Sequence, residues 1–310
     1  MQQTPSRRGV LEMTIAMCMA GTIGLFVLES KQPLVNVVFF RCLIGALCLA
    51  VYCARARLFR QADFSRRNLV LLLIVGLSIV FNWLALFDAY RYTSIGIAST
   101  VYHVQPFFVF FLGALLFKEK LSGQRLFWLI IGFAGVWLIV NPNVTHVTES
   151  GDYVKGCGLA LAAAMLYAVA TLSSKKIKGV PPHVIALVQL LIGIVILGPF
   201  AQFQSLPHAP AQWGCLLVLG AVHSAAMYIL LYSAYQKLDT SKIAILAYVY
   251  PVVAILVDYV YFGRVLSPTQ IAGGVLVLSA GLCSTLNVRI RSALQLSPDR
   301  GGRPRLIQPK

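Results

Sequence analysis

Residues 89–122 read AYRYTSIGIASTVYHVQPFFVFFLGALLFKEKLS, and residues 234–267, which begin 145 positions later, read AYQKLDTSKIAILAYVYPVVAILVDYVYFGRVLS. The two segments share an initial Ala-Tyr pair, a proline inside an apolar run, and a final Leu-Ser pair. A proline inside a membrane helix removes a backbone hydrogen bond, and matching interruptions in two halves are typical of transporters built from inverted repeats. We therefore predict two related halves that enclose a substrate site near the middle of the membrane.

The composition indicates a membrane protein with many spans. Hydrophobic residues make up 58% of the 310 positions and charged residues 12%, whereas soluble domains carry about 25% charged residues. The net charge of +16 lies in short basic clusters between apolar runs, so it indicates membrane topology and not a nucleic-acid partner. The seven cysteines occur singly, and neither metal-ligand spacing nor a phosphate-binding glycine loop is present. We therefore predict no metal and no cofactor.

Ten apolar runs qualify as membrane helices. A hydrocarbon core about 30 Å thick needs about 20 residues of helix. The fifth and tenth runs are shorter than this, and they hold corresponding places in the two halves. The runs cover residues 10–28, 33–52, 68–90, 95–117, 126–140, 156–173, 183–200, 213–235, 243–262 and 271–286. The sequence thus predicts an all-α polytopic membrane protein with ten transmembrane helices.

The basic residues predict the orientation of these helices. With a cytoplasmic amino terminus, 21 of the 26 Lys and Arg residues fall on the cytoplasmic side, in agreement with the positive-inside rule. Five helices per half then make the repeats inverted and place both termini in the cytoplasm. The predicted segments are a cytoplasmic amino terminus (1–9), a first repeat (10–140), an external linker (141–155), a second repeat (156–287) and a basic, disordered cytoplasmic tail (288–310).

Several motifs resemble those of a known family. They are Pro106 and Pro251, the run FKEKLS at residues 117–122, and Arg41 in the second span. On these motifs the chain resembles the ten-helix EamA-type branch of the drug/metabolite transporter (DMT) superfamily. The resemblance implies secondary transport of a small polar or amphipathic metabolite, commonly the export of an amino acid or a related compound. It also implies a multi-pass protein of the bacterial cytoplasmic (inner) membrane, surrounded by membrane lipid and acting as a monomer or a homodimer.

Polar side chains around the two prolines are the first candidates for a substrate site. A break at proline exposes backbone groups that only protein or cavity water can satisfy, so we expect Pro106 and Pro251 to bend their helices around a polar cavity. The same side chains could instead pack between helices, and for His103 the two roles are equally favoured. The candidates are Tyr102, His103, Gln105, Tyr248 and Tyr250 beside the prolines, with Asn82, Trp83 and Tyr167 on other spans.

Arg41 and three other titratable side chains lie within predicted spans. Arg41 is eight residues into its span, where an arginine costs at least about 2.5–3.5 kcal/mol to insert. It should therefore face the bundle and hold a carbonyl, a carboxylate or an anionic substrate, either as a binding residue or as an anchor of the helix. His223, Asp88 and Asp258 could carry a coupled proton. A helix–helix hydrogen bond for His223 and interfacial water for the two aspartates are the simpler roles.

Two other functions stay open on the sequence alone. An intramembrane hydrolase could use Ser78 and His223, which occupy matching repeat positions, but no GxSxG-like element and no orienting carboxylate accompanies Ser78. A non-transporting membrane receptor or scaffold is the other. A separate group of tyrosines lies at span ends, where we expect an interfacial aromatic belt: Tyr90, Tyr92, Tyr259 and Tyr261.

Overall fold

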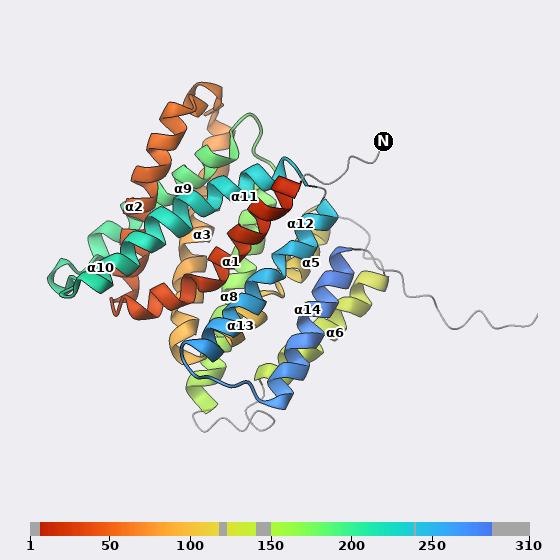
Figure 1. Cartoon of the computed structure of the whole chain (residues 1–310). Helices are drawn as coiled ribbons and strands as arrows, with labels where there is room; N and C mark the ends of the chain where they lie inside the picture. The colour runs from red at the N-terminus through yellow and green to blue at the C-terminus, as the bar shows by residue number, and fades with distance from the viewer. Residues whose placement is uncertain (1–6, 118–122, 141–149, 239, 287–310) are drawn as a thin grey trace, which may run out of the picture.

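The computed structural model describes residues 7–117, 123–140, 150–238 and 240–286, and within these ranges every regular element is a helix (Figure 1). Seven helices, or helices joined end to end, are long and apolar enough to cross a membrane, and three shorter apolar helices complete a set of ten in this part of the chain. The prediction of ten helical spans is confirmed. In chain order they are α1 (Arg7–Glu29), α2 (Leu34–Arg55), α3 (Arg66–Tyr92), α4 (Ile95–Tyr102) with α5 (Gln105–Phe117), α6 (Gly123–Val140), α8 (Ser150–Ser174), α9 (Pro182–Leu197), α10 (Pro210–Leu217) with η4 (Val218–Ala226) and α11 (Met227–Tyr235), α12 (Thr240–Ala247) with α13 (Val249–Val260), and α14 (Pro268–Thr285).

Three of the predicted spans are not single α-helices. The span at 95–117 is divided into α4 and α5, and the span at 243–262 into α12 and α13. The span at 213–235 contains a π-helical segment, η4, that the apolar pattern does not reveal. The helix α8 begins at Ser150, within the segment expected to be an external loop. The tail expected at 288–310 lies outside the described residues.

The contacts between helices follow the repeat symmetry. Helix α3 of the first repeat packs along α8 of the second. The equivalent contact, with the two repeats exchanged, joins α11 of the second repeat to α1 of the first. The helices α2 and α9 pack together, as do α6 and α14, so each of these four contacts its own counterpart. With five spans in each repeat, an odd number, the second repeat crosses the bundle in the opposite direction to the first.

The first and last described helices begin and end, respectively, at the same end of this bundle. Figure 1 shows the start of α1 and the end of α14 on the same side of the molecule. This is called the terminal end below, and the opposite side, where α4 begins, is called the far end. Because α4 and α13 carry the parts of their spans nearest the far end, they can close the bundle there.

Small residues allow α6 and α14 to cross closely. A Cβ atom on Gly135 would lie 2.7 Å from the carbonyl oxygen of Gly273, and a Cβ atom on Gly273 would lie 2.6 Å from the carbonyl oxygen of Gly135. Both distances are shorter than van der Waals contact, so the two backbones meet where each lacks a side chain. Such contacts are a common basis of helix association in membranes.

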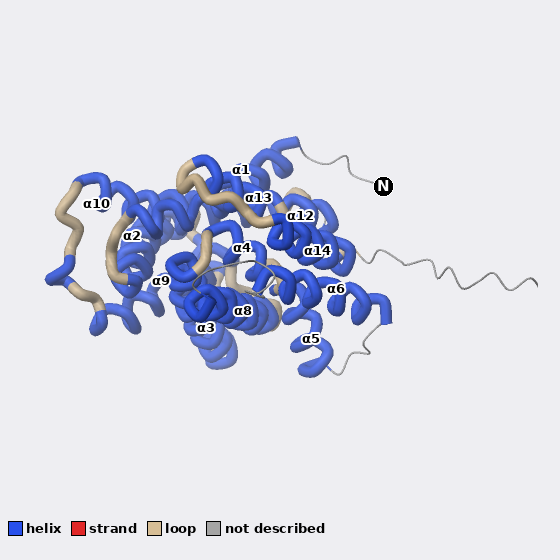
Figure 2. Tube along the Cα trace, turned by 90° about the horizontal axis from the view of Figure 1, so that it is seen from below, coloured by secondary structure: helices blue, strands red, loops and turns tan. Residues whose placement is uncertain are grey.

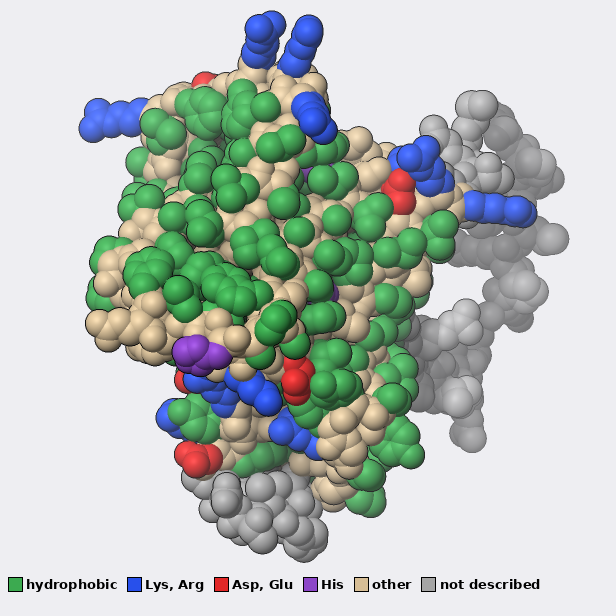
Figure 3. Space-filling view, turned by 60° about the vertical axis from the view of Figure 1, so that its left-hand side comes forward, with side chains coloured by type: hydrophobic (Ala, Val, Ile, Leu, Met, Phe, Trp, Pro, Cys, Tyr) green, Lys and Arg blue, Asp and Glu red, His purple; other side chains and the backbone are tan. Residues whose placement is uncertain are grey.

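The outer surface of the bundle suits a lipid environment. Figure 3 shows hydrophobic side chains spread over the flank of the molecule, with Lys and Arg side chains gathered toward its ends. Leu47, Leu115, Ile130 and Val195 are among the large apolar side chains on the surface, with 62–75% of their area exposed. Apolar surface of this extent is typical of a region covered by a membrane and not by water.

Candidate functional site

Both interrupted spans break at equivalent residues ahead of their prolines. The helix α4 ends at Tyr102 and α12 ends at Ala247, each four residues before the proline of its span, Pro106 or Pro251. Proline has no N–H, so it cannot bond the carbonyl of the residue four positions earlier. Each helix therefore stops at the residue whose carbonyl loses its partner.

The two breaks face each other across the interface between the repeats. The ring of His103, at the first break, stacks on Tyr250 with ring centroids 5.1 Å apart, and its centroid is 5.5 Å from that of Tyr248 at the second break. Nδ1 of His103 is 2.9 Å from the carbonyl oxygen of Ser99, and the same ring also bonds the backbone of Ala247. The polar groups that precede the two prolines thus meet in one region.

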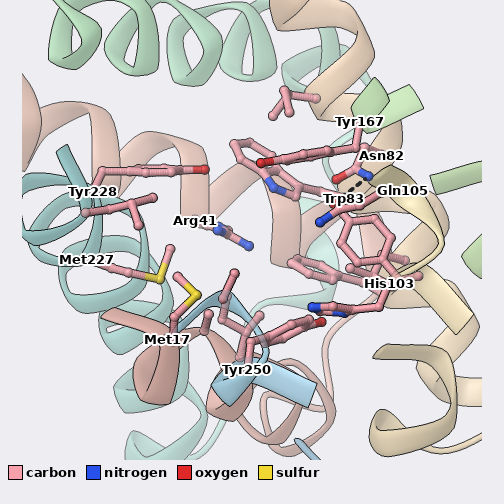
Figure 4. A pocket seen from close by; sticks show the side chains of 18 of the residues that line it. Met17, Arg41, Asn82, Trp83, His103, Gln105, Tyr167, Met227, Tyr228 and Tyr250 are labelled. Atoms are coloured by element: carbon pink, nitrogen blue, oxygen red, sulfur yellow. Dashed lines mark hydrogen bonds between the residues drawn. The ribbon is translucent and has the colours of Figure 1, made fainter. Parts of the chain in front are cut away.

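A cavity of about 190 Å³ lies in this region, lined by side chains from both repeats (Figure 4). Its walls are formed by α1, α2 and α3, by the residues at the two breaks, and by α8 and α11. Eight of the nine side chains predicted to bind substrate line it: Arg41, Asn82, Trp83, Tyr102, His103, Gln105, Tyr167 and Tyr250.

Tyr248 is the ninth predicted residue, and it does not line the cavity. Its ring lies beside His103, but its hydroxyl group occupies the place next to α14 where a Cβ atom of Gly281 would lie. The side chain at the second break therefore points between helices. The matching position in the first repeat is His103, which does line the cavity.

Arg41 extends from α2 into the centre of the cavity (Figure 4). The residue is 1% exposed, and its Nε atom donates to the hydroxyl oxygen of Ser224 at 2.7 Å. The guanidinium carbon lies 4.5 Å from the ring centroid of Trp83 and 5.3 Å from that of Phe87, within the range of cation–π attraction. As expected from its depth in the span, Arg41 faces the bundle, but the partners it has there are a hydroxyl group and two aromatic rings.

The cavity carries a positive charge with no carboxylate to balance it. Among the residues that the structure describes, the lining contains neither Asp nor Glu. The ion pairs of the described chain lie elsewhere and involve Glu12 and Asp258. In the same described part, Nη1 of Arg41 and Oε1 of Gln105 are buried atoms without a hydrogen-bond partner. The unpaired donor and the unpaired acceptor thus belong to two residues that line the same cavity.

Asn82 and two tyrosines form a fixed wall opposite α1. Nδ2 of Asn82 donates to the carbonyl oxygen of Ala163 in α8 at 2.6 Å and to the hydroxyl of Tyr102 at 3.3 Å. The rings of Tyr102 and Tyr167 meet edge to face with centroids 5.9 Å apart. Because its amide nitrogen is already engaged, Asn82 positions this wall by joining α3 to α8.

The cavity is closed at the far end by contacts between α4 and α13, which pack together. The hydroxyl of Tyr250 donates to Oγ of Ser99 at 2.9 Å and lies 3.3 Å from the hydroxyl of Tyr90. Beyond these hydroxyl groups, the carboxylate of Asp258 accepts the backbone N–H groups of Ile95 and Gly96 at the start of α4. Hydrogen bonds between the repeats therefore seal this end.

Two predictions made for side chains near the ends of spans are wrong. Asp258 is 2% exposed and caps α4, so interfacial water does not solvate it. Tyr90 is 1% exposed and lines the cavity, so it does not belong to an aromatic belt. In both cases tertiary packing over the end of the span removes the side chain from the interface.

The terminal end of the cavity lacks the corresponding closure. By repeat position α12 corresponds to α4 and α5 to α13, yet no comparable packing joins α12 to α5 in the described chain. Figure 2 shows these two helices on opposite edges of the bundle. Tyr235, the counterpart of Tyr90, is 40% exposed and lines the cavity at this end. Gly113 stands where the second repeat has Asp258, so the first repeat has no equivalent capping carboxylate.

The three residues considered for proton coupling all lie outside the lining. Nε2 of His223, in η4, is 3.0 Å from Oγ1 of Thr22 in α1, and its Nδ1 is 3.2 Å from the carbonyl oxygen of Val218. His223 therefore links two helices, and these partners occupy both ring nitrogens, so Ser78 is not among its hydrogen-bond partners. Asp88 is half-buried in the last turns of α3 at the far end.

Sequence reasoning did not single out several lining residues. Tyr90 and Tyr235 line opposite ends of the cavity, and the duplicated Ala-Tyr pair at the start of the repeated segment marks both. A face of α1 was also missed. Its lining residues are spaced by three or four positions, which is the period of a helical face: Met13, Met17, Ala20 and Ile23.

Comparison with protein families identifies both halves of the chain. The model of the EamA-like transporter family matches residues 7–141 and again residues 154–286. The two matches contain five of the ten helical spans each, and the helices broken at Pro106 and Pro251 fall at corresponding places within them.

Several bacterial relatives align along most of the chain. An uncharacterized transporter of Bacillus subtilis, YxxF, is 32% identical over 92% of this chain and 94% of its own length. The pseudopaline exporter CntI of Pseudomonas aeruginosa is 26% identical over 88% of this chain and 94% of its own length. The threonine/homoserine exporter RhtA of Escherichia coli is 24% identical over 88% of this chain and 90% of its own length.

A solved crystal structure shares the fold. It aligns with a TM-score of 0.62 at 17% sequence identity and covers 90% of this chain and 98% of the solved one. At that identity the likeness shows that the same arrangement of helices is used, and no more.

Proposed function

Since this chain belongs to the EamA-like transporter family and is a multi-pass integral membrane transporter, we propose that it is a secondary transporter that moves an amino acid or a related small metabolite. The cavity between the two repeats is the proposed binding site, and the eight predicted side chains that line it are the proposed contacts. Relatives named as exporters of threonine and homoserine and of pseudopaline support this cargo class and the outward direction.

One observation carries the proposed mechanism, the difference between the two ends of the cavity. The far end is closed by α4 and α13, while their counterparts α12 and α5 do not close the terminal end. In a protein with inverted repeats, exchanging the conformations of the repeats turns one such state into its opposite. Packing of α5 against α12, with separation of α4 from α13, would thus give the second state of an alternating-access cycle.

The direction of transport depends on which compartment faces the terminal end. The described terminal end carries most of the basic residues, among them the cluster Arg55, Arg57 and Arg60. The positive-inside rule therefore favours a cytoplasmic terminal end. In that orientation the cavity faces the cytoplasm and is ready to load a solute for export. Reporter fusions after residue 310 and within 141–149 would test the orientation, since an external carboxyl terminus would contradict it.

Transport can be tested with purified protein in liposomes. Vesicles preloaded with one unlabelled amino acid should accumulate the labelled form of the same compound, and threonine, homoserine and leucine are suitable first cargoes. Vesicles that contain Tyr102→Ala protein at equal abundance provide the control for the site. Absence of counterflow for every amino acid and amino-acid derivative offered would reject the proposed cargo class.

The same vesicles can show which gradient drives transport. Transport would use either the substrate gradient or a proton gradient, and collapse of the pH gradient stops only the second. His223, Asp88 and Asp258 are the proposed proton carriers if flux does depend on pH. Their replacement by Gln or Asn should then abolish that dependence while downhill flux continues.

A further inference from the structure

We propose that Arg41 binds a carboxylate group of the transported solute and that the cavity selects zwitterionic or monoanionic carboxylates over cations. The inference rests on the proposed transport function and adds the chemical class of the cargo and the side chains that recognise it. Two unpartnered buried atoms and the absence of acidic side chains from the described lining carry the argument.

The guanidinium group of Arg41 has more donors than the protein uses. A guanidinium carries five N–H donors and is always charged, and Arg41 directs its Nε donor at Ser224. Its Nη1 atom is buried and has no partner among the described residues. A buried charge without an opposite charge beside it is unfavourable. Retention of such a charge in the centre of a cavity is best explained by a partner that arrives with the solute.

That partner must be an acceptor that the described chain does not supply. The described ion pairs join Glu12 to Arg8 and Lys237, and Asp258 to Arg264, and all of these residues lie outside the cavity. Carboxylates and phosphates both pair with the planar guanidinium through two parallel hydrogen bonds, and a carboxylate is the anionic group that the proposed amino-acid cargo carries.

Gln105 supplies a second point of recognition. The residue lines the same cavity, and its Oε1 atom is buried without a partner among the described residues. Figure 4 shows Gln105 on the wall that Arg41 faces. An amide oxygen accepts N–H groups, so it would bind the ammonium or amide group of a solute whose carboxylate lies on Arg41. The aromatic rings of Trp83 and Tyr250 would then cover the apolar part of the solute.

The described lining offers one position, at Arg41, where an anionic group of the solute can bind. Counted from the N-cap residues Pro33 and Pro181, the position in α9 that corresponds to Arg41 is Gln189, and the counterpart of Gln105 is Tyr250. The repeat symmetry of the fold is therefore not matched by a symmetry of charge. A solute with a single carboxylate fits this arrangement, whereas a dicarboxylate would bury one carboxylate without a cation, which is unfavourable.

Matched ligands test this inference by binding to the purified full-length protein. For each of the leucine, threonine and phenylalanine side chains, the set contains the amino acid, its methyl ester, the acid without the amino group, and the amine without the carboxylate. Binding is read as the rise in melting temperature with ligand concentration. We expect both acids of at least one set to bind, and its ester and amine to bind about tenfold or more weakly, because each loses a charged hydrogen bond. Equal binding of an ester or an amine, or binding by no acid, would overturn the inference.

Variants of Arg41 and Gln105 connect the selectivity to the two atoms. Arg41→Met should abolish the discrimination between acid and ester, Arg41→Lys should keep part of it, and Arg91→Met should leave it unchanged. Arg91 is a suitable control because it lies at the far end and donates to the carbonyl oxygen of Gln32 at 2.9 Å. Gln105→Leu should weaken the binding of the amino acid and leave the binding of the acid without the amino group unchanged. If Arg41→Met does not fold, Arg41→Lys and Gln105→Leu still decide the outcome.

Counterflow in liposomes, measured beside binding, separates failure of the inference from failure of the proposed function. Counterflow of amines or esters that is insensitive to Arg41→Lys would reject the carboxylate site and leave a working transporter. Binding of acids that depends on Arg41, without flux of any solute in liposomes, would reject transport and leave the site intact.

Discussion

The carboxylate of Asp258, near the end of α13 in the second repeat, accepts the backbone N–H of Gly96 in the first turn of α4 in the first repeat. The same carboxylate also accepts the N–H of Ile95. The hydroxyl oxygen of Ser94 accepts the backbone N–H of Ile97. The first turn of a helix has no intrahelical acceptors for these donors and carries a partial positive charge. Asp258 therefore stabilises the closed far end only while α4 and α13 are together. Its hydrogen bonds to α4 exist in the state that is closed at the far end and are lost when that end opens.

Asp258→Asn should shift the protein toward the state that is open at the far end. The amide lacks the negative charge and one of the two acceptor oxygens of the carboxylate, at a cost of about 0.5–2 kcal/mol, which corresponds to about a two- to thirtyfold increase in the open population. The measurement is the rate at which a membrane-impermeant thiol reagent, added at the far end, labels Leu86→Cys, which lines the cavity. The seven native cysteines are first replaced.

Asp88→Asn is the matched control for that experiment. Asp88 also lies toward the far end, but it is half-buried and does not take part in the bonds to α4. Labelling of Leu86→Cys should therefore stay at the parental rate in this variant. Equal acceleration by both aspartate variants would mean that general loss of charge, and not the cap, opens the far end.

Tyr250→Phe should weaken the same closure from inside the cavity. The change removes the hydroxyl that donates to Ser99 and contacts Tyr90, at an expected cost of about 1 kcal/mol to the closed far end. Thiol labelling of Leu86→Cys should rise about fivefold. Tyr259→Phe is the control, because that ring is exposed on the surface. A rise in both variants, or in neither, would contradict the assigned bond.

The repeated segment predicts the position of the helix breaks because each break is caused by the covalent structure of proline, which has no backbone N–H. Pro106 and Pro251 remove a hydrogen bond wherever the surrounding helix lies, and the register between the repeats then predicts that the residues before them meet. This local reasoning is enough to identify Tyr102, Gln105 and Tyr250 as neighbours of one cavity.

Other features depend on contacts between distant residues that no local pattern contains. The sequence places Asp258 near the end of a span, but its partner Gly96 lies 162 residues away. Tyr90 has the position of an interfacial tyrosine, and only the packing of the second repeat over α3 turns it into a buried lining residue. The π-helix at η4 is equally hidden, since its apolar composition would suit an α-helix.

Asn82 and Gln105 are both amides of the cavity, and their replacement should have different effects. Asn82→Ala removes the bonds that join α3 to Ala163 and to Tyr102, so it should lower the melting temperature together with transport, at a cost of about 1–3 kcal/mol. Gln105→Ala removes an unpartnered oxygen and should lower transport with little loss of stability. Abundance, melting temperature and counterflow measured on the same preparations decide this. Parallel loss of all three in Gln105→Ala would assign that residue to packing.

Replacement of two neighbouring glycines of α14 by alanine should have different effects on stability. A Cβ atom at Gly273 would lie 2.6 Å from the carbonyl oxygen of Gly135, and a backbone atom cannot move aside cheaply, so Gly273→Ala should destabilise the protein by about 1–3 kcal/mol. A Cβ atom at Gly274 would lie 3.6 Å from Cγ2 of Thr100, an ordinary contact. Gly274→Ala should therefore be neutral, or stabilising by up to about 1 kcal/mol from its helix propensity. Thermal unfolding of the two variants in the same detergent measures the difference. Equal melting temperatures would show that α6 and α14 do not cross at Gly135 and Gly273.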